Sequence, residues 1–112
     1  MTTRNRVQLV GNLGMNPEIV SFESGKKLAK FTVATNESFS NGNGKTKTET
    51  QWHNVVAWGK LADVAEKELQ KGKEVALEGR LTYRNYEDKN KQTRHVTEIV
   101  LSNFITYPGS KV

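Results

Sequence analysis

The sequence of 112 residues contains no cysteine. This absence excludes disulfide frameworks, thiolate metal sites and cysteine nucleophiles. Long apolar runs are also missing, and no stretch approaches the about 18 residues that a membrane-spanning helix needs. The first residues, MTTRNRVQLVG, hold no apolar segment ahead of a small-residue cleavage site, so we expect no secretion signal. The sequence therefore predicts a cytoplasmic protein.

Catalytic groups are equally scarce. Neither histidine, His53 or His95, has a serine or carboxylate spaced as a catalytic partner, and we interpret His53 as a packed or hydrogen-bonded structural residue. Gly11 and Gly14 do not belong to a phosphate-binding loop, because the Lys-Ser/Thr ending and the following helix are missing. We therefore expect a protein that binds, and not an enzyme, with no metal site and no cofactor.

Positive charge is in moderate excess. Lys and Arg number 17 against 12 Asp and Glu, which gives a net charge of +5 and a pI near 9.6. A pI above about 9 in a single domain suggests nucleic-acid binding. An ordinary soluble surface carries a similar excess, however, so the charge is informative only where it accompanies exposed aromatic rings.

Alternating apolar and polar residues dominate the chain and predict strands. Residues 60–71 instead form a helical stripe, with Gly72 expected as the C-cap. The stripe consists of Leu61, Val64, Ala65 and Leu69. The polar stretches 40–49 and 87–93 are typical of long loops. The long predicted strands are 6–13, 28–38, 50–59, 74–86 and 95–107, and a short extra one covers 18–22.

The order of the long strands predicts the fold. Three strands, one helix and two further strands are typical of an OB-fold, a five-stranded Greek-key β-barrel with the helix between strands three and four. We assign residues 1–108 to this all-β domain with one helix and 109–112 to a short C-terminal end. Such barrels bind oligonucleotides or oligosaccharides, but a fold alone does not decide between functions.

Two tryptophans lie on one face of the predicted strand 50–59. Trp52 and Trp58 share this face with Asn54, because side chains alternate along a strand. Val55 and Ala57 share the other face and suit a tight barrel interior. Both indoles would then point outward, about 20 Å apart. Burial of both indoles in the core is an equally good alternative on this strand alone.

Strand 74–86 combines cations and a ring on its predicted outer face, which includes Arg80, Arg84 and Tyr86. The predicted inner face is apolar and consists of Val75, Leu77, Leu81 and Tyr83. Phe39 is a similar aromatic residue near cations, because it lies at the mouth of the other long loop and lysines follow it in the sequence. The sequence thus predicts four outward rings placed among cations.

Such a surface suits single-stranded nucleic acid. Unpaired bases stack on aromatic rings, each worth about 1–3 kcal/mol, and cations neutralise the phosphates between them. A duplex hides its base faces, and a carbohydrate site has no need of a cationic rim. A module whose outward rings form a protein interface is the alternative from another functional class.

The chain also resembles the bacterial single-stranded DNA-binding protein family. The resemblance extends from Arg6 to about Ile105. It rests on the segments VQLVGNLGMNPE, KFTVATNES, TQWHNVVAWGKLADVAEKELQKG, VALEGRL and TEIV. It implies a homotetramer of OB-folds, associated with the nucleoid, that wraps and protects single-stranded DNA in replication, recombination and repair.

The resemblance also implies roles for individual residues. By position, the family's stacking residues correspond to Phe39, Trp52, Trp58 and Tyr86. Its basic DNA-contacting residues correspond to Arg6, Lys60, Lys71, Arg84 and Arg94. The position of His53 corresponds to a subunit-interface residue.

One departure from the family pattern concerns the C-terminus. No acidic residue follows Glu98, whereas family members usually continue into a linker with a short acidic tip that recruits repair enzymes. This puts tail-mediated recruitment in doubt. It also keeps open an alternative, a tailless dimeric OB-fold adaptor of the primosomal replication-restart type, although the two tryptophans favour the first interpretation.

Overall fold

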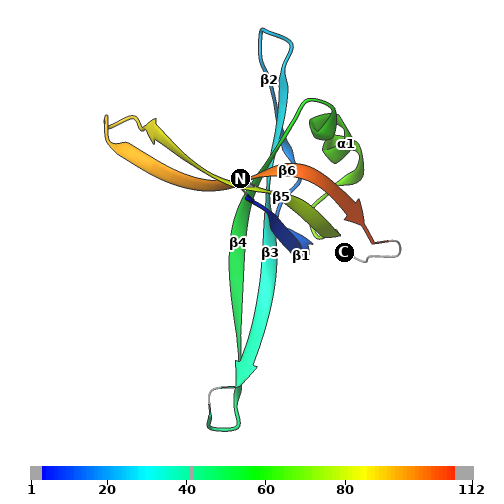
Figure 1. Ribbon diagram of the computed structural model, residues 1–112, viewed down its shortest axis with the longest axis vertical. Helices are drawn as coiled ribbons and strands as arrows, with labels where there is room; N and C mark the ends of the chain where they lie inside the picture. Colours follow the sequence, from blue (N-terminus) through cyan, green and yellow to red (C-terminus); the bar gives the residue numbers. More distant parts are fainter. Residues whose placement is uncertain (1–3, 41, 108–112) are drawn as a thin grey trace.

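The computed structural model describes residues 4–40 and 42–107 and shows a small barrel from which long hairpins project (Figure 1). Its elements are β1 (Val7–Leu13), β2 (Glu18–Ser21), β3 (Lys27–Ser40), β4 (Thr46–Trp58), α1 (Lys60–Glu68), β5 (Glu74–Glu87) and β6 (Thr93–Thr106). The predicted short C-terminal end at 109–112 lies outside the described residues.

The described strands form one sheet that closes on itself. The strand order is β1-β5-β6-β4-β3-β2, and β1 also pairs with β3, so β1, β3, β4, β5 and β6 complete a ring. The β4–β6 pair is parallel, and the other pairs are antiparallel. The short β2 lies outside this ring and pairs with β3 alone. The predicted five-stranded OB-fold with its helix between the third and fourth barrel strands is confirmed.

The barrel interior is filled by small and medium apolar side chains. Phe31 and Val33 of β3 are buried, as are Val55 and Ala57 of β4. These residues alternate along their strands, as the sequence pattern predicts, because every second side chain points to the same face of a sheet. A bulge opposite Glu78 and Gly79 gives β6 one extra residue, which brings Phe104 against this core.

Helix α1 packs against this core with a stripe that differs from the predicted one. Ala62 and Ala65 are buried, but Val64 is exposed, so its predicted place in the stripe is wrong. The helix ends at Glu68 because Leu69 adopts an extended backbone and is buried in the core. Gly72, predicted as the C-cap, instead lies in the following turn, where its N–H donates to the Leu13 carbonyl.

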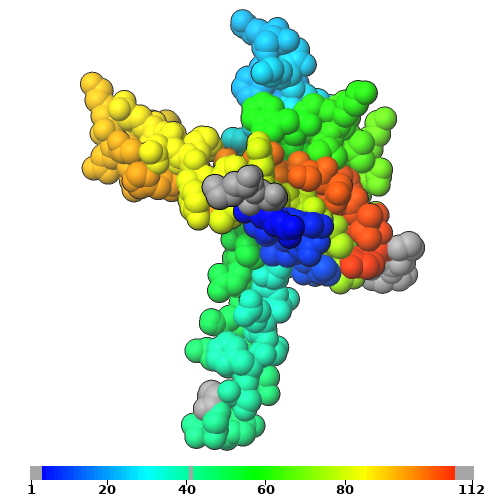
Figure 2. Space-filling view, in the orientation of Figure 1, coloured from blue at the N-terminus to red at the C-terminus, as the bar shows by residue number. Residues whose placement is uncertain are grey.

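Strand pairing extends into both predicted long loops, over Ser40 and 46–49 in the first and over Glu87 and Thr93 in the second. Strands β3 and β4 stay paired out to Ser40 and Thr46, and together they form one long arm (Figure 1). Polar pairs across the arm stabilise it, including a 2.7 Å hydrogen bond from Thr50 Oγ1 to Asn36 Oδ1. Strands β5 and β6 form a second arm, paired out to Glu87 and Thr93. We name them the β3–β4 arm and the β5–β6 arm, and both project from the barrel (Figure 2).

The arms also explain why one predicted core residue is exposed. Tyr83 was expected on the inner face of its strand, yet 76% of it is exposed. Leu81, two residues earlier, still packs partly against the core. Beyond Leu81 the strand leaves the barrel, so an inward-facing side chain has no core to pack on.

Candidate nucleic-acid interface

All four predicted stacking rings are exposed. The exposed fractions are 44% for Phe39, 61% for Trp52, 46% for Trp58 and 47% for Tyr86. The alternative that both indoles belong to the core is therefore wrong. Both indoles lie on β4, whereas Phe39 is on the β3–β4 arm and Tyr86 on the β5–β6 arm. Phe39 is the second-last residue of β3 and lies opposite Lys47, close to the tip of the arm.

The Trp52 indole lies directly against the turn that follows β1. A Cβ atom added to Gly14 would overlap the six-membered ring of Trp52. The Gly14 N–H donates to the Thr32 carbonyl at 2.9 Å, which fixes this turn against β3. The absence of a side chain at Gly14 therefore leaves room for the indole, which stays 61% exposed.

A groove of about 570 Å³ begins beside the second indole, Trp58. Its apolar lining includes Val56 and Val100, which face each other across the parallel β4–β6 pair. Val56 lies on the same face of β4 as the two tryptophans but is buried. It is paired with Val100 of the neighbouring strand β6. Lys30 and Arg84 line the same groove. The groove thus offers an apolar surface together with cations.

Arg84 is held in place by Glu98. Its Nη2 and Nε atoms donate to the two carboxylate oxygens at 2.8 and 3.2 Å. These hydrogen bonds lower the pKa of Glu98 below its ordinary value of 4.5 and raise the pKa of Arg84. The guanidinium also lies 5.7 Å from the centre of the Tyr86 ring. A cation and an aromatic ring are therefore fixed as one unit on β5.

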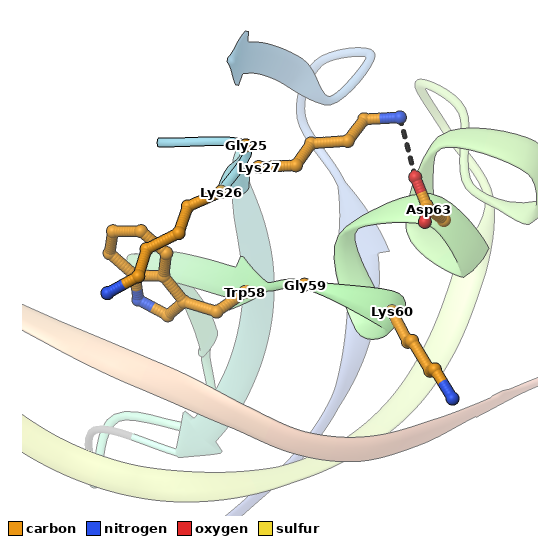
Figure 3. A pocket seen from close by; sticks show the side chains of 7 residues that line it. All are labelled: Gly25, Lys26, Lys27, Trp58, Gly59, Lys60 and Asp63. Atoms are coloured by element: carbon orange, nitrogen blue, oxygen red, sulfur yellow. Dashed lines mark hydrogen bonds and ion pairs between the residues drawn. The ribbon is translucent and has the colours of Figure 1, made fainter. Parts of the chain in front are cut away.

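Trp58 also lines a second cavity, of about 760 Å³ (Figure 3). Lys26 and Lys60 line it, and their side chains extend in different directions from the chain. Lys27, in contrast, points to α1 and pairs with Asp63 at 2.7 Å. Lys60, one of the predicted basic residues, is thus placed close to a predicted stacking ring.

The other predicted basic residues are less closely grouped. Arg6 pairs with Glu78, which lines a separate cavity on β1, β5 and β6. Arg94 pairs with Asp88 at 2.8 Å near the tip of the β5–β6 arm. Lys71 is exposed in the turn after α1. The structure therefore brings Lys60 and Arg84 close to Trp58 and leaves the remaining three around the edge.

His53 has the surroundings of a structural histidine. It is half-buried, and its Nε2 atom lies 2.9 Å from Thr35 Oγ1 on the neighbouring strand. His95 forms a hydrogen bond through Nδ1 with Asn85 Oδ1 across the β5–β6 arm. Both histidines thus form hydrogen bonds across paired strands.

Comparisons with known proteins agree with this geometry. Residues 4–107 match the model of the single-strand binding protein family. The chain belongs to this family. It is 43% identical over 100 residues to single-stranded DNA-binding protein 1 of Chlorobaculum tepidum, a match that covers 88% of this chain and 62% of that protein. This chain therefore spans about three fifths of the length of that relative.

A solved structure supports the same family assignment. The chain superimposes on the Plasmodium falciparum SSB in its complex with ssDNA with a TM-score of 0.86 and 32% identity. The match covers 96% of this chain and 97% of that chain. That structure therefore shares this fold over almost the whole chain.

Sequence reasoning missed Phe22. Its ring stacks on Trp58 with centroids 6.0 Å apart and planes inclined by 21°. The sequence held one signal, an aromatic residue directly before a Ser-Gly turn, similar to the signal that singled out Phe39. Within residues 4–40 and 42–107 no cluster of three His or acidic side chains is arranged to hold a metal ion. Nor does that part of the chain contain a helix long and apolar enough to cross a membrane.

Proposed function

We propose that this chain binds single-stranded DNA without sequence preference and has no catalytic role. The observation that carries the proposal is the exposure of Trp52 and Trp58 on one strand, beside a groove that also presents Lys30 and Arg84. Aromatic rings accept any base face, and cations accept any phosphate, so such a surface does not depend on sequence. The ssDNA named in the Plasmodium complex supports this ligand.

Each predicted residue has a part in this proposal. Phe39, Trp52, Trp58 and Tyr86 stack on bases. Lys60 and Arg84 neutralise phosphates near Trp58. Arg6, Lys71 and Arg94 extend the cationic path around the barrel. By wrapping single-stranded DNA in this way, the protein would protect it during replication, recombination and repair. It would act in the cytoplasm, associated with the nucleoid.

We further propose that the chain acts as a homotetramer. Val10, Ala76 and Ile105 form a row across three neighbouring strands, because Ala76 pairs with both of the others. Val10 and Ile105 are both well exposed and line one cavity with Ala76. An exposed apolar row of this kind is typical of an interface. His53 is proposed as a second contact between subunits.

The test of the proposed function is a titration of the protein with oligo-dT at low salt, followed by intrinsic tryptophan fluorescence. We expect strong quenching, because stacked bases cover the indoles. A blunt duplex of equal length should compete poorly, since its base faces are hidden. Absence of quenching would contradict the proposal and favour a protein-interaction surface. The mass of the assembly in solution separates the tetramer from the dimer expected of the restart adaptor.

A further inference from the structure

The contact between Phe22 and Trp58 joins two segments that are distant in sequence. Phe22 follows β2 and Trp58 ends β4. Leu28 of β3 pairs with Trp58 on one side and with Val20, two residues before Phe22, on the other. The two rings are nearly parallel, with centroids 6.0 Å apart, so each ring covers part of one face of the other.

Backbone and side-chain contacts hold Phe22 in this position. Its N–H donates to the Lys26 carbonyl and its own carbonyl accepts from Gly25, both at 2.9 Å, in the turn between β2 and β3. The residue after that turn, Lys27, pairs with Asp63 and Glu66 of α1 at 2.7 and 2.6 Å. The ring is thus positioned by the fold before any ligand binds.

The pair remains open to solvent. Phe22 is 43% exposed, close to the 46% of Trp58, although a ring that served only to pack would be expected deeper in the structure. Phe22 and Trp58 both line the 570 Å³ groove, where Lys30 and Arg84 also lie. Lys26 and Trp58 also line the 760 Å³ cavity together (Figure 3). Trp58 therefore lines two cavities that both contain lysine side chains.

We infer that Phe22 is a further stacking residue, which binds a nucleobase on the face turned away from Trp58. The two rings form a two-layer platform that takes one base at each outer face. The phosphate that joins these two nucleotides would pass close to Lys26 or Lys30. This inference rests on the proposed function, because it extends the same single-strand surface by one nucleotide.

The test compares variants of the full chain in oligo-dT titrations at low salt. Phe22→Leu keeps an apolar side chain against Trp58 but removes the aromatic face, whereas Phe22→Tyr keeps that face. We expect Phe22→Leu to raise the Kd by about 5- to 150-fold, the range for one stacked base, and Phe22→Tyr to retain the affinity. Val64→Ala, an exposed apolar position on α1, is the control and should bind like the parent chain.

A second readout separates stacking from mere support of Trp58. Oligo-dT carrying 5-iodouracil is irradiated on the parent chain, and the cross-linked peptides are identified by mass spectrometry. We expect an adduct on Phe22 itself. Adducts on Trp58 but none on Phe22, or an unchanged Kd for Phe22→Leu, would overturn the inference while leaving the proposed function intact. If the parent chain fails to bind oligo-dT, both proposals are wrong.

Discussion

The guanidinium of Arg84 lies 5.7 Å from the centre of the Tyr86 ring, two residues further along β5. The Glu98 carboxylate on the neighbouring strand holds this arginine with two hydrogen bonds. A cation placed over an aromatic face is attracted to it by about 0.5–1 kcal/mol at exposed sites. The β5–β6 arm therefore presents a cation and an aromatic ring at a fixed spacing.

Removing either indole on β4 should weaken binding and leave the fold intact. We expect Trp52→Ala and Trp58→Ala each to cost roughly 1–3 kcal/mol in the free energy of binding oligo-dT, the value of one stacked base. Both side chains are about half exposed or more, so the barrel does not need them. Oligo-dT titration measures the loss, and circular dichroism checks the fold. Unfolding of either variant would contradict the surface role.

Affinity should fall steeply with salt. For single strands, the plot of log K against log salt has a slope of about −0.7 for each phosphate that the protein neutralises. Lys60→Gln removes one exposed cation beside Trp58 and should make the slope less steep by about 0.7. Titrations at several salt concentrations measure both slopes. A flat dependence in the parent chain would argue against a cationic path.

Two glycines of the β1 region should respond differently to substitution by alanine. A Cβ atom at Gly11 would overlap the Ala34 backbone of β3, where the barrel closes, so Gly11→Ala should lower stability by roughly 1–3 kcal/mol or more. A Cβ atom at Gly14 meets the Trp52 indole instead, which can move. Gly14→Ala should chiefly weaken oligo-dT binding. Thermal unfolding and oligo-dT titration of both variants distinguish these effects. A stable Gly11→Ala variant with weak binding, together with an unstable Gly14→Ala variant, would contradict the prediction.

Acid should destabilise the fold partly through Glu98. Hydrogen bonds from Arg84 lower the pKa of this carboxyl in the folded state below 4.5. Because the pKa of Glu98 is lower in the folded state than in the unfolded state, the ionised carboxylate stabilises the fold at pH values above its unfolded-state pKa. This stabilisation is lost as the pH falls through the folded-state pKa. Glu98→Gln should therefore flatten the fall in Tm between about pH 5 and pH 3. The more exposed Asp63, paired with Lys27, provides the control Asp63→Asn, for which a smaller effect is expected.

A charge placed in the apolar row of β1, β5 and β6 should dissociate the proposed assembly. Ile105→Lys puts a cation where an apolar face is expected to be covered, and the surface of the free chain tolerates it because Ile105 is already exposed. Light scattering should show a smaller mass with unchanged circular dichroism. An unchanged mass would exclude this row as an interface.

Alternation along the strands was enough to predict the barrel and the exposure of two of its aromatic rings. Val55 and Ala57 are small and apolar, and their burial turns Trp52 and Trp58 outward. Alternation cannot show where a strand leaves the barrel, so Tyr83 was placed inside.

The two arms and the contact of Phe22 with Trp58 could not be predicted from the sequence. The polar residues around 40–49 have turn-forming chemistry, and only pairing across β3 and β4 makes Ser40 and 46–49 strand. The contact of Phe22 with Trp58 depends on two chain segments that meet only in the folded sheet. Local sequence holds no information about such a meeting.

The projecting arms carry a consequence for the shape of the ligand. Phe39 and Tyr86 lie on paired strands that have almost no apolar interior beneath them, and elements of this kind bend at low energetic cost. The two indoles, in contrast, are attached to the rigid wall of the barrel. In the proposed complex, a flexible single strand would therefore contact the two indoles at fixed positions. Phe39 and Tyr86 on the arms would shift to follow each bend of the strand.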